Sequence, residues 1–317
     1  MKIAPALLLS LASLGAAADD FPSKPVRILI GFTPGGGPDI TARQLAQKLG
    51  ELWKQQVIVE NRPGAGGTLA AAQVAKAAPD GYTLLSVSSA HAIAPAIYPG
   101  LPYDTLKDLA GITQTGTSKY VLVAAPSQGW KSVKDLIAAA KAKPGQINFS
   151  SAGVGSGTHF AGEIFKSMAQ IDVVHVPFKG IPEALTETFT GRVHFFLAPI
   201  ANAVAPVKDG RLLGLGVSMP ERDALLPDVP TVDEAGVPGY QTDLWFGLVT
   251  SSAVPRTVVD KLNRDIVKVL GEPELKNRWA AIGIVPTPMS PEAFDRRIRE
   301  QIDVFTRFAS AAAIRAE

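Results

Sequence analysis

Three segments of the chain repeat one pattern: a short apolar run, a glycine-rich loop, and then apolar residues at helical spacing. Apolar runs rich in Val, Ile and Leu that alternate with helical segments are typical of an α/β fold with a mainly parallel sheet. The repeat therefore restricts the chain to strand–loop–helix units. The loops are Pro34–Asp39, Pro63–Thr68 and Gly153–Thr158, and they follow apolar runs at 26–30, 57–59 and 147–149.

Glycine loops between a strand and a helix suit an anionic ligand. Glycine lets a ligand approach the backbone closely, and the helix that follows presents free N–H groups and the positive end of its dipole. One such loop is equally consistent with a tight turn. Three in one chain favour a binding site, because α/β proteins bind ligands at the carboxyl ends of their strands.

The first residues predict an export signal. Lys2 is followed by an apolar stretch over residues 3–14 and by three alanines ending at Ala18, the pattern of a cleavable signal peptide over residues 1–18. The alternative, a membrane anchor, requires ~20 apolar residues, and this run is shorter. We therefore expect export, cleavage near Ala18, and a mature chain of about 300 residues, which corresponds to two domains of ~150 residues each.

Charge and cysteine content exclude several classes of protein. The formal net charge is +2, from 31 Lys and Arg against 29 Asp and Glu, which is too small for a dedicated nucleic-acid binder. The chain contains no cysteine, which excludes disulfides, thiolate metal sites, a cysteine nucleophile and a lipid-modified cysteine. We expect no nucleic-acid partner.

The order of the segments predicts two domains, the first of them discontinuous. Strand-like runs at Tyr120–Ala124 and Leu244–Val249 enclose a middle segment with its own α/β pattern, and the chain after Thr250 is mostly helical. These helices are expected to cover the sheet of the first domain. The predicted boundaries are 19–120 plus 247–317 for the first domain and 121–246 for the second, with a crossover strand at each end of the second domain.

The sequence lacks the motifs of common catalytic and cofactor sites. The two candidates for G-x-G-x-x-G carry Ile40 and Thr158 in place of the third glycine, and there is no P-loop. Ser156 lies directly between two glycines, which breaks the hydrolase motif G-x-S-x-G. The four histidines form no i,i+4 metal pair. We expect no catalytic residue, cofactor or metal; the alternative is an exported α/β hydrolase or isomerase that uses Ser156 and His159.

Several residues near the loops have two interpretations. Asp39 and Thr68 occupy expected helix N-cap positions, where they either cap the helix or contact a ligand. His159 lies in the first turn of a helix beside two hydroxyl residues, where it can donate a hydrogen bond to a ligand or act as a base. Phe32 either packs in the core or forms a wall of the cleft.

Six motifs follow one another along nearly the whole mature chain: Phe32-x-Pro34-Gly35-Gly36-x-x-Asp39, Val59-Glu60-Asn61-Arg62-Pro63-Gly64-Ala65-Gly66-Gly67, Pro79-Asp80-Gly81-Tyr82-Thr83-Leu84, Gly153-x-Gly155-Ser156-x-x-His159, His175-Val176-Pro177-Phe178-Lys179-Gly180 and Leu226-Pro227-Asp228-Val229-Pro230-Thr231-Val232-x-Glu234-Ala235-Gly236. Together they resemble the Bug-type extracytoplasmic solute receptors of tripartite tricarboxylate transporters. The resemblance implies a two-domain periplasmic binding protein with a type II-like architecture, in which each domain is a mainly parallel sheet flanked by helices and the ligand cleft lies between the domains.

The resemblance also implies a receptor without catalysis. It would capture a small carboxylate, either an aliphatic or aromatic acid or an amino acid, for the membrane subunits of the transporter, as a monomer in the periplasm. A second alternative with the same fold is a module that senses a ligand for a membrane kinase. Ligand binding is expected to close the two domains by a hinge in the crossover strands, one of which holds Trp245.

The resemblance places the ligand in two facing loops, held by backbone amides, hydroxyls and ordered waters. The residues it assigns are Phe32, Gly35, Gly36, Gly37 and Asp39 in the first loop, Gly155, Ser156, Thr158 and His159 in the second, and Thr68, Ser88, Ala90, Phe178 and Ala198 around them. The chain departs from the family at Phe178, where Tyr is frequent, at His194, where Asp is usual, and in the apolar segment 197–199. These departures favour a ligand with an apolar or aromatic body.

Overall fold

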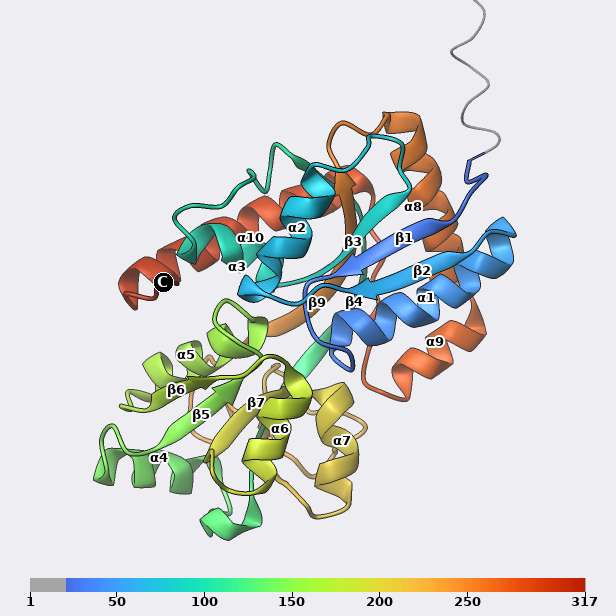
Figure 1. Ribbon diagram of the computed structural model, residues 1–317. Coiled ribbons are helices and arrows are strands. Elements are labelled where there is room, and N and C mark those ends of the chain that lie inside the picture. Colours follow the sequence, from blue (N-terminus) through green and yellow to red (C-terminus); the bar gives the residue numbers. More distant parts are fainter. Residues whose placement is uncertain (1–20, 317) are drawn as a thin grey trace, which may run out of the picture.

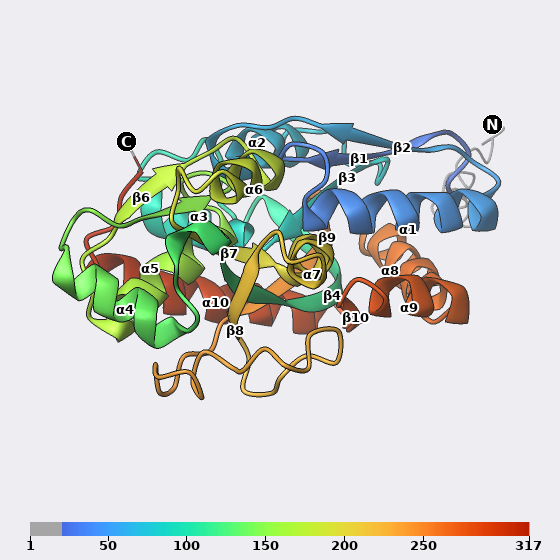
Figure 2. The same ribbon diagram turned by 90° about the horizontal axis from the view of Figure 1, so that it is seen from below.

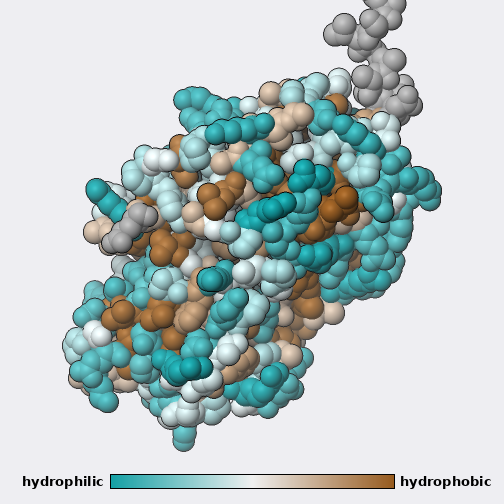
Figure 3. Space-filling view, viewed as in Figure 1, coloured by the Kyte–Doolittle hydropathy of each residue, from teal (hydrophilic) through white to brown (hydrophobic). Residues whose placement is uncertain are grey.

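The computed structural model describes residues 21–316, which form two α/β lobes (Figure 1). The predicted signal peptide over residues 1–18, with its cleavage site near Ala18, lies outside the described residues. Among the helices of residues 21–316, none combines the length and the apolar character needed to cross a bilayer. On the face shown in Figure 3, hydrophilic side chains predominate and the apolar residues form small separate patches on both lobes.

The sheet of the first lobe combines parallel and antiparallel strands. β1, β2 and β3 run parallel with β1 in the middle, and β9 lies antiparallel between β3 and β4. The short β10 pairs with β4. The predicted apolar runs at 26–30 and 57–59 therefore lie in neighbouring parallel strands. The bounds are β1 (Val26–Ile30), β2 (Val57–Asn61), β3 (Thr83–Ser88), β4 (Leu109–Ala124), β9 (Asp243–Ser251) and β10 (Val285–Pro286).

Helices cover both faces of this sheet, because its strands are apolar on both sides. Ile28 and Ile30 pack in one cluster with α1 and α8, whereas Leu29 packs in another with α2 and α10. Figure 2 shows α1 and α2 on opposite sides of the strands. The helices of this lobe are α1 (Gly37–Trp53), η1 (Ala65–Gly67), α2 (Thr68–Ala75), α3 (Ala90–Ile97), α8 (Arg256–Leu270), α9 (Pro273–Ala280) and α10 (Pro291–Ala311).

The second lobe repeats this architecture around a smaller sheet. β5 lies between β6 and β7 and is parallel to both, and β4 is antiparallel to β7 and to β8. Each lobe thus has a parallel core to which antiparallel strands are added. The elements are η2 (Pro126–Gln128), α4 (Val133–Ala142), β5 (Asn148–Ser151), α5 (Gly157–Ala169), β6 (Val174–Pro177), α6 (Ile181–Phe189), β7 (Phe195–Pro199), α7 (Ile200–Lys208) and β8 (Leu213–Val217).

The long strand β4 passes through both lobes. Its residues 109–119 pair with β9 in the first lobe, and residues 120–124 pair with β7 and β8 in the second. Both predicted boundaries, 120/121 and 246/247, fall inside strands. The run Leu244–Val249 was expected to be the strand by which the chain crosses back to the first lobe. It lies in β9, which pairs with β3 and β4 from Asp243 onward and so belongs wholly to the first lobe. The second crossover is therefore the segment 218–242 that precedes β9.

Trp245 consequently does not lie at a hinge. It is fully buried in the first lobe, where its ring packs edge-on against Phe294 of α10 at 5.6 Å between centroids. Its neighbours Leu244 and Phe246 face the opposite side of the strand, because side chains alternate along a strand. Trp245 is thus a poor reporter of movement between the lobes.

The helical tail covers the first lobe, as expected, and it also reaches the second. α10 packs on α3 and on β4. Near its end, Phe305 contacts Phe160 of α5 with ring centroids 5.4 Å apart, and Phe308 contacts the same ring at 5.9 Å. The two lobes are therefore held together by an aromatic contact on α10 as well as by the two crossover segments.

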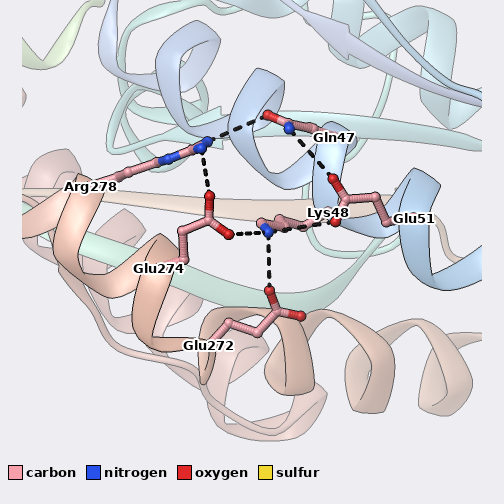
Figure 4. A network of polar contacts seen from close by, with 6 residues as sticks. All are labelled: Gln47, Lys48, Glu51, Glu272, Glu274 and Arg278. Atoms are coloured by element: carbon pink, nitrogen blue, oxygen red, sulfur yellow. Dashed lines mark hydrogen bonds and ion pairs between the residues drawn. The ribbon is translucent and has the colours of Figure 1, made fainter.

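A charged network attaches α9 to α1 (Figure 4). Lys48 of α1 is nearly buried and pairs with Glu51 at 3.5 Å, with Glu272 at 3.6 Å and with Glu274. Arg278 also pairs with Glu274, at 2.6 Å. A lysine placed among three carboxylates offsets their mutual repulsion, so the network fixes α9 against the outer side of α1.

Candidate functional site

A small cavity of about 40 Å³ lies between the two lobes, at the carboxyl ends of β1, β3 and β5. The described residues that line it include no charged side chain. Outside it, a wider opening of about 850 Å³ shares Phe32, Thr33 and Ala152 with the cavity and is also lined by Phe178 and Lys179. The cavity is lined by Phe32, Thr33, Gly36, Gly37, Pro38, Ser88, Leu244 and Phe246 from the first lobe and by Tyr120, Ala152, Ser156, Gly157, Thr158, Gly180, Ile181 and Pro199 from the second.

The first predicted loop forms one wall of the cavity. Gly36 is the N-cap of α1, and Pro38 in the first turn has no N–H to donate. The amides of Gly36 and Gly37 donate to no acceptor within residues 21–316. The predicted N-cap position of Asp39 is wrong, because Asp39 lies inside the first turn of α1 and its carboxylate reaches back to the amide of Gly35 at 3.0 Å.

Asp39 supports the loop from behind and does not line the cavity. Its carboxylate accepts hydrogen bonds from Arg43 and Asn61, each at 3.0 Å. Burial alone would raise the pKa of Asp39, but the bonds from Arg43, Gly35 and Asn61 outweigh this effect and hold the pKa below its usual value. The carboxylate is therefore ionised and compensates the positive end of α1.

The second predicted loop forms the opposite wall and presents hydrogen-bond donors. Ser156 is the N-cap of α5, and its hydroxyl accepts the His159 amide at 3.2 Å. The hydroxyl of Thr158 accepts the Ala152 amide at 2.9 Å, and the two hydroxyls lie 3.0 Å apart. One of the two hydroxyls donates its proton to the other, and the proton of the second hydroxyl remains available for another acceptor. The amides of Gly157 and Thr158 also have no acceptor in the described part of the chain.

His159 holds this loop in shape and does not line the cavity. Its Nδ1 accepts the Gly155 amide at 3.3 Å, so the ring is neutral with its proton on Nε2, which faces Glu163 at 3.9 Å. The ring stacks on His175 at 4.0 Å between centroids. Ser156 Oγ is bonded by the backbone of His159 and not by its ring. The geometry therefore does not join Ser156 and His159 as the nucleophile and base of a hydrolase.

Buried neutral histidines predict a stability that depends on pH. Burial lowers the pKa of His91 and of His159 to about 4 and that of His175 to about 3, from an ordinary value of 6.5. Each group binds more protons in the unfolded chain than in the folded one, so stability falls as the pH drops below about 6.5, by up to about 1.4 kcal/mol per pH unit for each histidine. The loss levels off near pH 4 for His91 and His159 and near pH 3 for His175. Melting curves from pH 7 to 4.5 should show a falling midpoint, with a shallower slope for His91→Gln. A midpoint independent of pH over this range would contradict the prediction.

The remaining predicted site residues lie in different places, and only some of them line the cavity. Ser88 lines the cavity, and Phe178 lines only the outer opening. Thr68 is the first residue of α2 and not its N-cap, which is Gly67; Thr68 and Ala90 line a small adjoining cavity of about 20 Å³, which shares Phe32 and Ser88 with the first. Ala198 is fully buried in the core of the second lobe, and the next residue, Pro199, lines the cavity instead. Gly35 and Gly155 shape the two loops, and Gly155 has a φ of +79° that favours glycine.

Several lining residues were not among the predicted site residues: Thr33, Tyr120, Gly180, Ile181, Pro199, Leu244 and Phe246. Tyr120 shows why they were missed. It lies in an apolar run that is typical of a core strand, and its position in the cavity wall depends on where β4 passes from one lobe to the other. The alternation of Leu244 and Phe246 around Trp245 is the one local signal that places two of these residues on a common face.

The departure at His194 has no bearing on the site. His194 bonds to Asn148 at 2.8 Å and stacks on Trp130. It precedes β7, whereas Pro199, the last residue of that strand, lines the cavity. A strand of this length places them roughly 16 Å apart.

Comparison with known proteins agrees with this architecture. The tripartite tricarboxylate transporter family receptor, TctC, matches residues 41–312. The protein BugT from Bordetella pertussis is 32% identical over 288 residues, which is 90% of this chain and 88% of BugT. The structure of the periplasmic binding protein BugD is 26% identical, has a TM-score of 0.89, and aligns over 94% of this chain and 100% of BugD.

Two related structures contain a bound acid. An R. palustris protein with adipate is 30% identical with a TM-score of 0.89, over 93% of this chain and 99% of that protein. MatC from Rhodopseudomonas palustris with bound malate is 30% identical with a TM-score of 0.86, over 90% of this chain and 99% of MatC. BugD is a periplasmic binding protein and the matching family is a family of transporter receptors, which supports the expectation of a receptor rather than an enzyme. The extent of the family match, together with the two glycine loops facing a cavity between two lobes, shows that this chain is a member of the tripartite tricarboxylate transporter receptor family.

Proposed function

We propose that the chain is a periplasmic receptor that captures a small carboxylate and delivers it to the membrane subunits of a tripartite transporter. One observation carries the proposal. At the amino end of α5, the amides of Gly157 and Thr158, which have no acceptor among residues 21–316, and one hydroxyl proton from the Ser156–Thr158 pair face a cavity whose described lining residues carry no charge. A helix N-terminus with free donors suits an anion, and a carboxylate accepts several hydrogen bonds at once.

The location and domain division belong to the same proposal. The predicted signal peptide supports export, and a relative with the same architecture is a periplasmic binding protein. We propose that the two lobes, which are joined by β4 near Tyr120 and by the segment 218–242, move as separate units with the ligand between them. Bonds from Asn202 Nδ2 to Gly35 O at 3.0 Å and from Tyr98 Oη to Val154 O at 3.2 Å join the two lobes beside the site.

A thermal-shift series tests the ligand class. Acids such as hexanoate, benzoate, adipate and malate are compared with glucose and with calcium chloride. An acid present at a hundredfold excess over its Kd stabilises the folded state by about 2.7 kcal/mol, which raises the melting temperature by roughly 4 °C for a chain of this length. A shift with glucose or calcium and with none of the acids would rule out a carboxylate receptor.

A further inference from the structure

We infer that a cavity between α3, α5 and α10 is a second binding site, which takes a small neutral molecule with an apolar ring and one oxygen atom. Its occupant holds the two lobes in the arrangement seen here. Binding at this site is independent of the proposed function, whereas its effect on acid binding rests on that function.

The cavity is larger than the one in the cleft and touches both lobes. Its volume is about 120 Å³, against about 40 Å³ for the cleft cavity, and Tyr120 and Gly157 line both, so the two cavities adjoin at the first turn of α5. α3 and α10 of the first lobe face α5 of the second across it, where the end of α10 lies beside α5 (Figure 2). Tyr120 of β4 and residues 241–242 of the crossover segment also border it. Both connections between the lobes therefore reach this cavity.

Two buried hydroxyls form the polar part of the lining. Ser89 is 2% exposed and Tyr120 is 1% exposed, and neither hydroxyl has a hydrogen-bond partner among residues 21–316. Ser89 is the N-cap residue of α3, but its side chain makes no capping bond. Both hydroxyls lie so close to Gly157 that a Cβ there would overlap them, so they also lie near each other. If one donates to the other, the second proton still needs an acceptor, and an oxygen atom of a bound molecule supplies it.

The remaining walls are apolar and fit a ring. Ile93 and Phe160 are fully buried, and the ring of Phe305 lies edge-on to that of Phe160 with centroids 5.4 Å apart. Benzene binds in an apolar protein cavity of about 150 Å³, which is close to the volume found here. A six-membered ring therefore matches the space between these side chains.

The charge of the lining favours a neutral molecule. Asp243 is the one charged side chain among the described residues that line the cavity. Its carboxylate is already paired with Arg297 of α10. An ionised ligand would lose its hydration without gaining an uncompensated partner, which is strongly disfavoured.

An occupant of this cavity favours the same arrangement of the lobes as an acid in the cleft. It contacts α10 of the first lobe and α5 of the second at once, so it binds best where both walls are within reach. In this structure the lobes also meet beside the acid site, where Asn202 bonds to Gly35 at 3.0 Å. Two ligands that favour one arrangement raise each other's affinity by the same factor.

Benzyl alcohol is the probe, because it combines a neutral ring with one hydroxyl. Titration of the mature protein followed by NMR should give a dissociation constant in the millimolar range, as expected for a molecule of this size. Ser89→Ala should weaken benzyl alcohol by about fivefold and leave toluene, which has no oxygen, unchanged. Val304→Trp should abolish binding, because Val304 lines the cavity and is 46% exposed, so a larger side chain there blocks the entrance without disturbing the core. Ile58→Trp is the matched control, since Ile58 is 40% exposed on β2 and does not line this cavity.

The effect on the lobes is measured by titrating the best acid of the thermal-shift series with and without saturating benzyl alcohol. We expect the acid to bind about fivefold more tightly with the alcohol in the original protein and in Ile58→Trp, and equally with and without it in Val304→Trp.

The outcomes separate this inference from the proposed function. If benzyl alcohol does not bind, or binds Val304→Trp as it binds the original protein, the second site is wrong. If it binds at the cavity but leaves the acid's affinity unchanged or lowers it, the occupant does not hold the lobes in this arrangement. If no acid binds while benzyl alcohol does, the proposed function falls and the second site stands.

Discussion

Replacing Gly157 with alanine is expected to weaken ligand binding by more than a hundredfold. A Cβ at this position would overlap the Tyr120 hydroxyl and lie 2.5 Å from Ser89 Oγ, so the first turn of α5 must move away from β4 and α3. That movement displaces the amides of Gly157 and Thr158, which have no other acceptor in the described chain. Losing two hydrogen bonds to a charged group costs about 3–6 kcal/mol, which is more than about a hundredfold in affinity. Calorimetric titration with the best acid of the thermal-shift series measures the loss.

The free energy of unfolding of Gly157→Ala distinguishes steric overlap with Tyr120 from the helix propensity of alanine. Alanine favours a helix over glycine by about 1 kcal/mol, so propensity alone predicts a small gain in stability. Overlap with Tyr120 predicts a loss of about 1–3 kcal/mol instead. Gly100→Ala is the matched control, because Gly100 is exposed and a Cβ there meets no atom within 4 Å. If Gly157→Ala binds the acid with an affinity within threefold of that of the original protein, the prediction is wrong and the ligand does not bind at the amino end of α5.

The strands and helices that could be predicted are those with a complete local signal. An apolar run, a glycine loop and a helical spacing predicted β1 with α1 and β5 with α5, and the structure contains both units with their loops facing each other. The loop Pro63–Thr68 carries the same signal but lines only the outer opening and the small adjoining cavity. Its glycines let the backbone pass close to β1, since a Cβ on Gly31 would overlap the Cα of Gly67. Sequence alone does not separate glycine that admits a ligand from glycine that admits another strand.

The pairing of strands that lie far apart in the sequence could not be predicted from the local pattern of apolar and polar residues. β9 follows β3 in the sheet although more than a hundred residues separate them along the chain, and β4 contributes to both lobes. Those pairings place Tyr120, Leu244 and Phe246 in the cavity wall. In the sequence, each of the three lies in an apolar run that is typical of a core strand.

The roles of individual side chains depend on details finer than their position in the chain. His159 lies in the first turn of α5, as predicted, but its ring turns toward His175 and the amide of Gly155. Ala198 and Pro199 are neighbours, yet only Pro199 lines the cavity. A shift of one residue along a strand exchanges its two faces, so a family motif locates such a site to within a residue or two and no better.

Replacing Gly180 with alanine is expected to hold the two lobes apart while leaving each lobe folded. Gly180 caps α6 in the second lobe with an extended backbone that any residue adopts, so alanine introduces no backbone strain there. Its Cβ, however, would overlap Thr33 Oγ1 of the first lobe. Unless the Thr33 side chain rotates away, the lobes then cannot approach as closely as they do in this structure. The bonds of Asn202 with Gly35 and of Tyr98 with Val154 would be lost as well.

A ligand between separated lobes touches only one of them. It would keep either the donors of α5 or the apolar surface of Phe246 but not both, so we expect an affinity lower by about a hundredfold or more, while the melting temperature of the ligand-free protein changes little. Small-angle scattering should show a radius of gyration that contracts with ligand in the original protein and stays large in Gly180→Ala. Thr33→Gly in the same chain removes the opposing atoms and should restore both contraction and affinity. If Gly180→Ala contracts with ligand as the original protein does, the prediction is wrong. The two lobes then close on the ligand without the close contact between Thr33 and Gly180.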